Sequence, residues 1–176
     1  MLIREMTEDE CRLALPEVSL GRLACAETRG QPYVVPVYLA FQGNYLYGFS
    51  SEGKKIECMR TNPLVCVEIE DLKSVEEWTT LIVFGAYEEL PDTVDYEATR
   101  SLAHGLLGKR ALWWQPAWVA VTNTKLAKIF NPVFYRIRIE RITGHHAERE
   151  SISTYPPLSG QPGLLRRVLN QIWSGT

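Results

Sequence analysis

Two serines, a glycine and two lysines stand together at residues 50–55, in the order Ser-Ser-Glu-Gly-Lys-Lys. The residues before them alternate as a strand, and the residues after them are spaced as a short helix. Hydroxyls, backbone N–H groups and ammonium groups would therefore share one small volume, which is the donor set that binds a phosphate monoester. Lysines at a helix N-terminus disfavour the helix by roughly a few tenths of a kcal/mol each, and a bound dianion would reverse that sign. The spacing alone leaves two interpretations open, a phosphate site and a solvated turn with two surface lysines.

Metal and nucleophile chemistry have little support elsewhere in the chain. None of the four cysteines belongs to a C-x-x-C pair or stands close to a histidine, which favours small buried side chains in a reducing compartment over a zinc site. His145 and His146 are adjacent on an extended segment and would point to opposite sides. We find no Ser-His-Asp arrangement and expect no metal site. The cysteines are Cys11, Cys25, Cys58 and Cys66.

Composition indicates an ordinary globular protein. The 176 residues are 45% hydrophobic and 23% charged, with a net charge of −2, so nothing draws the chain towards nucleic acid or an anionic membrane. No apolar run approaches the roughly 20 residues of a membrane span. The N-terminus is charged within four residues and lacks a secretory signal pattern, so we expect a cytoplasmic protein.

The periodicity predicts a mainly β fold. Strands are expected at residues 21–27, 31–41, 44–50, 64–70, 78–90 and 132–143. They are joined mostly by hairpins, with no β-α-β alternation and no G-x-G-x-x-G motif. A closed or partly closed six-stranded antiparallel barrel with peripheral helices satisfies this pattern without leaving open edges.

Several local features are also predicted. Helices are expected at residues 7–15, 53–61 and 92–109, the first with a capping box made by Thr7 and Glu10. The acidic residues 71–77 are predicted to form a solvated loop. Gly85, inside a strand, indicates a bulge or a close backbone approach. In the strand over 44–50, Tyr45, Tyr47 and Phe49 share one face.

Two parts of the chain are distinguished by composition. Residues 1–146 are predicted to form the barrel domain, and residues 147–176 a C-terminal tail. The run from Gly144 to Gly163 is typical of a linker or an extended tail. A short amphipathic helix is expected at residues 163–173, docked on its own domain or on a partner subunit.

Most of the barrel pattern resembles a known family. The segments GRLACAE, GQPYVVPVYLAFQGNYLYGFSSEGKKIECMRTNPLVCVEIED, WTTLIVFGAYEEL and FYRIRIERITG are similar to the pyridoxamine 5'-phosphate oxidase-like family of FMN-binding split barrels. The branch that includes nitroimidazole-resistance proteins is the most similar. The resemblance implies a six-stranded split barrel that forms a homodimer and holds FMN non-covalently in a groove at the subunit interface.

The resemblance also implies which residues would bind the cofactor. The backbone of Val35, Pro36 and Val37 would line the flavin ring. Tyr47, Ser50 and Ser51 would flank the ribityl chain or the phosphate. Lys54 and Lys55 would bind the phosphate, with Lys55 the more direct contact. Trp78, Thr79 and Thr80 would lie near the ring or the phosphate tail. Trp113 and Trp114 would reach the flavin from the second subunit, although the residues alone also leave open a place in the core or in the dimer interface.

The implied activity is flavin-dependent oxidoreduction of a small molecule, with electrons from NAD(P)H or another donor. No residue is assigned a catalytic role, because the chemistry would be the flavin's. Phe49 stands where many members of this branch carry a histidine, so it would either stack near the ring or belong to the core. This departure keeps an alternative open, a flavin- or haem-binding carrier or sensor without turnover. Oxidation of pyridoxamine 5'-phosphate itself is less favoured, because no basic C-terminal substrate motif is found.

Overall fold

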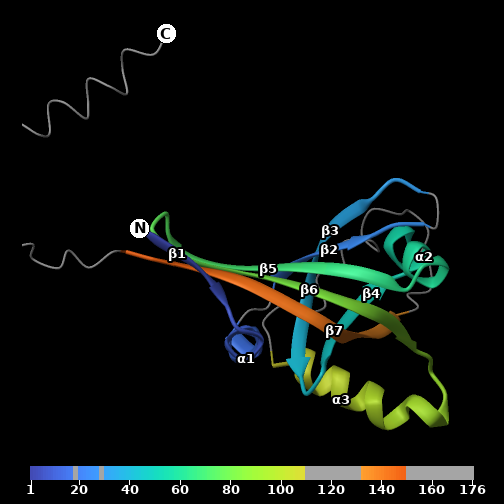
Figure 1. Ribbon diagram of the computed structural model, residues 1–176. Coiled ribbons are helices and arrows are strands. Elements are labelled where there is room, and N and C mark those ends of the chain that lie inside the picture. Colours follow the sequence, from blue (N-terminus) through green and yellow to red (C-terminus); the bar gives the residue numbers. More distant parts are fainter. Residues whose placement is uncertain (18–19, 28–29, 110–131, 150–176) are drawn as a thin grey trace, which may run out of the picture.

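The structure, a computed structural model, describes residues 1–17, 20–27, 30–109 and 132–149. Its main feature is one antiparallel sheet that closes on itself (Figure 1). The strands of the described chain are β1 (Leu2–Met6), β2 (Leu20–Cys25), β3 (Tyr33–Gln42), β4 (Tyr45–Ser51), β5 (Leu64–Ser74), β6 (Glu77–Leu90) and β7 (Pro132–Glu148).

Closure comes from the last strand. The sheet order is β7-β4-β3-β2-β5-β6, and β6 pairs back onto β7, so six strands form a barrel and the predicted fold class is confirmed. β1 was not predicted, because its five residues show no clear alternation of apolar and polar side chains. It pairs with β7 from Leu2↔Glu148 to Met6↔Gly144, beyond the part of β7 that pairs with β4.

The barrel interior is filled by alternate residues of every barrel strand, as a period of two requires. Two helices extend this core. Helix α1 (Glu8–Ala14) begins with the predicted Thr7–Glu10 capping box and buries Cys11. Helix α2 (Lys54–Thr61) buries Ile56, Cys58 and Met59. The largest fully buried side chains of this interior include Leu23, Leu46, Val67, Val83, Tyr135 and Ile137.

Helix α3 (Glu97–Leu107) covers the outside of the barrel. It follows a short 3-10 turn at Val94–Tyr96, so the helix begins later than the predicted residue 92. Ala103 and Leu107 of α3 pack on outward-facing residues of β3, β4 and β7, including Tyr47 and Phe134. This second apolar cluster is separate from the barrel interior.

The two longest hairpin strands run further than expected. Only Val75 and Glu76 form a turn in the predicted loop at 71–77, because Asp71–Ser74 ends β5 and Glu77 opens β6. The side chains of this range are mostly polar and exposed, but the strand backbone remains paired, because a ladder with solvent on both faces tolerates charge on either face. Likewise residues 144–148 belong to β7 rather than to a linker, since β1 and β6 pair with them on both sides. Figure 1 shows β1 and the β5–β6 turn at the end of the molecule far from α2.

Gly85 is a point of close backbone approach, as predicted. The β6–β7 register shifts between Phe84 and Gly85, and a Cβ on Gly85 would lie 2.4 Å from the carbonyl oxygen of Arg138. Gly48 is similarly constrained, because a Cβ there would lie 2.3 Å from Cζ of Tyr135. Both glycines therefore let the barrel wall close.

Within the described part of the chain, no helix combines the length and the apolar composition needed to cross a membrane. The division of the chain at residue 146 stays a prediction, and the predicted helix at 163–173 lies outside the described residues.

Candidate functional site

The predicted phosphate loop lies where β4 passes into α2. β4 ends at Ser51, and Gly53 is the N-cap of α2, with φ +157° and no side-chain cap. The first hydrogen bonds of the helix run from the N–H groups of Ile56 and Glu57 to the carbonyl oxygen of Gly53. The N–H groups of the first helical turn therefore face outward without a capping side chain. The space beside Gly53 is open, because a Cβ on this residue would meet no atom within 4 Å.

Lys55 lies half-buried at this helix start. Burial lowers the pKa of its ammonium group below the ordinary value of 10.5. Among the described residues no carboxylate oxygen lies within 4.0 Å of Lys55, although eleven other basic–acidic pairs meet that limit. A partly desolvated cation is costly unless an anion compensates it. The site is thus arranged to receive a negative charge.

Lys54 and the serines complete the same end of the barrel. The Nζ atom of Lys54 lies 5.0 Å from the ring centroid of Tyr33, the first residue of β3. Ser50 is buried and donates its hydroxyl to the carbonyl oxygen of Ser51 at 2.6 Å. The Ser50 hydroxyl is therefore already engaged, and Ser51, half-buried, is the serine closer to solvent.

The predicted ring-lining residues follow directly along β3. Val35 and Val37 turn towards the interior, whereas Pro36 is exposed. They follow Tyr33 closely in β3, and the ring of Tyr33 contacts the ammonium group of Lys54. The structure therefore brings together Lys54, Lys55, Ser51 and the first half of β3.

Tyr47 and Phe49 face the other way. Both lie on the outer face of β4 with Tyr45, as predicted, and pack against the cluster beneath α3. The ring centroids of Phe49 and Phe134 are 5.0 Å apart. Phe49 therefore packs in this outer core, and Tyr47 is turned away from the interior face that Ser50 occupies.

Trp78, Thr79 and Thr80 lie at the opposite end of the sheet. Trp78 pairs with Leu72, whereas Ala86 pairs with Leu64, the first residue of β5 after α2. The offset of about eight residues along β6 amounts to about 26 Å. One subunit therefore does not bring these three residues to Lys55. Trp113 and Trp114 lie outside the described residues.

Thr79 has a partner that sequence reasoning missed. Its Oγ1 lies 2.9 Å from Nδ1 of His146, which stands opposite Thr79 in the β6–β7 register. Their separation of 67 residues left no local signal for this pair. His145 faces away from His146, as expected, and the described residues contain no group of three or more metal-binding side chains.

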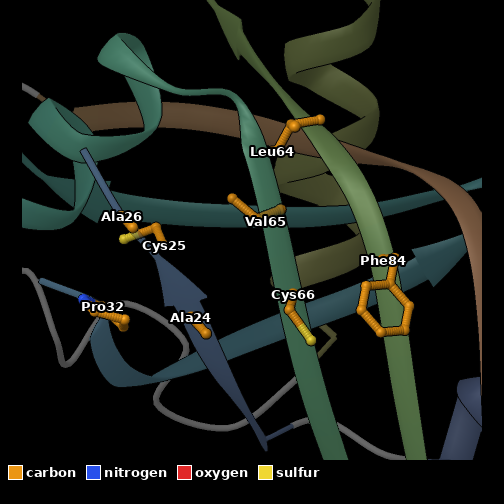
Figure 2. Close-up of a pocket in the computed structure, with 8 residues that line it drawn as sticks. All are labelled: Ala24, Cys25, Ala26, Pro32, Leu64, Val65, Cys66 and Phe84. Carbon is orange, nitrogen blue, oxygen red and sulfur yellow. The ribbon is translucent and has the colours of Figure 1, made fainter. Parts of the chain in front are cut away.

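An apolar groove borders the loop and was not predicted. It lies on the outside of the barrel between the end of β2 and the start of β5, with a volume of about 280 Å³ (Figure 2). Cys25 belongs both to the groove and to the loop region, since its Sγ lies 4.0 Å from the carbonyl oxygen of Lys55. Burial, with a smaller effect of Cys58, raises the pKa of Cys25 to about 11, so this thiol is neutral at physiological pH. The groove residues are Ala24, Cys25, Ala26, Pro32, Leu64, Val65, Cys66 and Phe84.

The fold defines a class, a six-stranded antiparallel split barrel in which β4 passes directly into α2. Residues 7–146 match the family model described as pyridoxamine 5'-phosphate oxidase. The chain belongs to this family.

Solved and curated relatives agree with this assignment. The chain is 40% identical to a FAD-binding protein from Mesorhizobium loti, with a TM-score of 0.69 over 85% of this chain and 99% of that one. It is 35% identical to an uncharacterised protein of Rhizobium meliloti, over 84% of this chain and 97% of the relative. A candidate 5-nitroimidazole antibiotic resistance protein from Bacteroides thetaiotaomicron shares the fold, with 15% identity and a TM-score of 0.57 over 83% of this chain and 89% of that one.

Replacing Lys55 with methionine is expected to stabilise the flavin-free protein at neutral pH. Because burial lowers the folded-state pKa of Lys55, its protonation opposes folding. This cost is fully present below the folded-state pKa and disappears as the pH rises to 10.5, where the unfolded chain also loses the proton. Chemical denaturation should therefore give Lys55→Met the higher midpoint at neutral pH, with a difference that shrinks towards pH 10.5.

Lys73→Met serves as the control, since Lys73 is exposed and pairs with Glu77 at 3.2 Å. A Lys55→Met protein that is less stable than wild type at neutral pH would show that the Lys55 charge has a compensating partner in the folded chain.

Proposed function

We propose that this protein binds FMN, with the flavin phosphate at the N-terminus of α2, and acts as a flavin-dependent oxidoreductase on a small molecule. The observation that carries this proposal is the half-buried Lys55, which has no carboxylate partner among the described residues and lies beside uncapped helical N–H groups. A phosphate dianion would compensate the charge of Lys55 and accept hydrogen bonds from these N–H groups. Membership in the pyridoxamine 5'-phosphate oxidase family supports the choice of a flavin.

The residues present fit that group. Lys55 and the first N–H groups of α2 would hold the phosphate, with Lys54 and Ser51 at its margin. The first half of β3 would support the ring. When bound, the flavin supplies hydride and electron transfer, and the protein supplies binding and orientation. FAD carries the same ribityl phosphate, and the Mesorhizobium loti relative is a FAD-binding protein, so FAD is the competing form of the cofactor.

A second subunit would complete the site. The separation of about 26 Å along β6 between Trp78 and the α2 end exceeds the length of an FMN molecule. If both ends of the sheet contact one flavin, Trp78, Thr79 and Thr80 must come from a partner copy. Exposed apolar side chains support an interface beside the groove, since Val34 is 59% and Leu64 63% exposed.

A second candidate is a flavin-binding protein without turnover. It is supported by Cys25, whose thiol lies beside the backbone of Lys55. Cys25 is neutral at physiological pH because its pKa is raised to about 11. This thiol therefore offers no general base poised near neutral pH.

Lys55→Met should weaken FMN binding at least about tenfold, because a charge-assisted contact to the phosphate is lost. Titration of flavin fluorescence measures the affinity, with riboflavin as the phosphate-free comparison and Lys73→Met as the control protein. Riboflavin affinity should be unchanged. Retention of wild-type FMN affinity by Lys55→Met would remove the phosphate assignment, and binding of FAD but not FMN would correct the cofactor.

Anaerobic mixing with NADH or NADPH should bleach the visible absorption of the bound flavin if the protein is an oxidoreductase that uses a nicotinamide donor. The control is the same donor mixed with free FMN at equal concentration. Flavin that binds tightly but is reduced no faster than free FMN by either donor would favour the carrier or sensor.

Mixed dimers should reveal whether the site is shared. Lys55→Met and Trp78→Ala subunits, carrying different tags, are co-expressed and the heterodimer is isolated. If Lys55 and Trp78 act from different subunits, one intact site remains and one flavin binds per heterodimer, while each mutant homodimer binds none. An empty heterodimer would place both residues in the same subunit's site, and a monomer in sedimentation would exclude the shared site.

A further inference from the structure

Arg60, in the last turn of α2, is held by two carboxylates. Its Nη1 and Nη2 groups donate to the two oxygens of Glu52 at 2.8 and 2.9 Å. Its Nε and Nη2 groups donate to the two oxygens of Glu89 at 2.7 Å each. The guanidinium is thus bidentate towards both partners, the strongest geometry available to this side chain.

The second carboxylate fixes Arg60 to the barrel wall. Glu89 lies near the end of β6, and the hydroxyl of Tyr87 donates to its Oε2 at 2.8 Å. Hydrogen bonds from Arg60 lower the pKa of Glu89, and the two carboxylates raise the pKa of Arg60. Glu89 therefore ties the guanidinium of Arg60 to the barrel wall.

Glu52 is the unusual member of this group, because it immediately precedes Gly53, the N-cap of α2. Acidic side chains are favoured at helix N-termini, so a Glu52 carboxylate released from Arg60 would be attracted to the uncapped N–H groups of the first turn and to the ammonium group of Lys55. Arg60 stands about six residues after the first helical residue, about 9 Å along the axis. Its hydrogen bonds draw the Glu52 carboxylate along the side of the helix, away from the anion site.

We propose that Arg60 is a positioning residue that keeps Glu52 out of the phosphate site. Without Arg60, the carboxylate of Glu52 occupies the first turn of α2 and competes with the flavin phosphate for the same donors. The inference rests on the proposed binding of the flavin phosphate at this helix. This role differs from a purely structural one. Under the proposal, the loss of Arg60 weakens FMN binding because Glu52 carries a negative charge.

Four proteins test the proposal: wild type, Arg60→Met, Glu52→Gln and the double variant. The measured quantity is the ratio of FMN affinity to riboflavin affinity, which cancels effects on the ring and on overall folding. We expect Arg60→Met to lower this ratio about tenfold, through the competing charge. Glu52→Gln alone should leave the ratio at or above the wild-type value, and the double variant should regain most of the loss.

Arg12→Met is the matched control for the change in net charge, since Arg12 pairs with Glu8 on α1 at 2.8 Å. It should leave the ratio unchanged. If Arg60→Met does not fold, Arg60→Lys takes its place, because it keeps the charge and the stem but not the bidentate geometry. Arg60→Lys should lower the ratio of FMN to riboflavin affinity less than Arg60→Met does. Adding Glu52→Gln should restore this ratio in the same way.

Two outcomes overturn the inference. A double variant as weak as Arg60→Met would show that Arg60 acts by supporting the loop, whatever the charge of Glu52. An Arg60→Met protein with the wild-type affinity ratio would show that Arg60 plays no part in binding the flavin phosphate. A wild-type protein that binds FMN no better than riboflavin would instead refute the phosphate site itself, so the two failures are distinguishable.

Discussion

The pairing of β6 with β7 closes the barrel, and every other feature depends on it. The ladder runs from Leu90↔Phe134 to Trp78↔Ala147, which leaves neither strand with a free edge on that side. Closure requires the wall to bend at Gly85, where the carbonyl of Arg138 approaches too closely for any side chain. Because β7 is longer than its neighbours, its other side pairs first with β4 and then with β1. That arrangement places the end of β4, and so the start of α2, at one end of the barrel.

The start of α2 is arranged against its own stability. The helix lacks a side-chain cap, carries two lysines where the helix dipole disfavours them, and leaves Lys55 half-buried without a carboxylate among the described residues. Glu52, which immediately precedes the N-cap Gly53, is bound by Arg60 instead. Local conflicts of this kind are expected where a ligand supplies the missing interaction. The same pattern supports the proposal that a ligand binds at this helix start.

Parts of the site could be predicted and parts could not, for physical reasons. The loop at 50–55 was recognisable because strand, glycine and helix follow one another directly, and local order determines which groups meet there. The common face of Tyr45, Tyr47 and Phe49 followed from the period of two. That this face is covered by α3 depends on packing between distant segments. The extent of β5 was missed because its polar end lacks the apolar alternation that reveals a strand, although backbone pairing does not require it.

By itself the sequence determined the class of fold, the succession of strand, glycine loop and helix at residues 50–55, and the close backbone approach at Gly85. Each of these follows from periodicity or from neighbours along the chain. Only the tertiary structure decided which lysine is half-buried, which carboxylates hold Arg60, and that Trp78 lies at the end of the sheet far from the start of β5. Glu52 and Glu89 are distant in the chain, and they meet on one guanidinium because closing the barrel brings the end of β6 beside α2. Burial and long-range charge pairing arise only when the sheet closes, so no local pattern could reveal them.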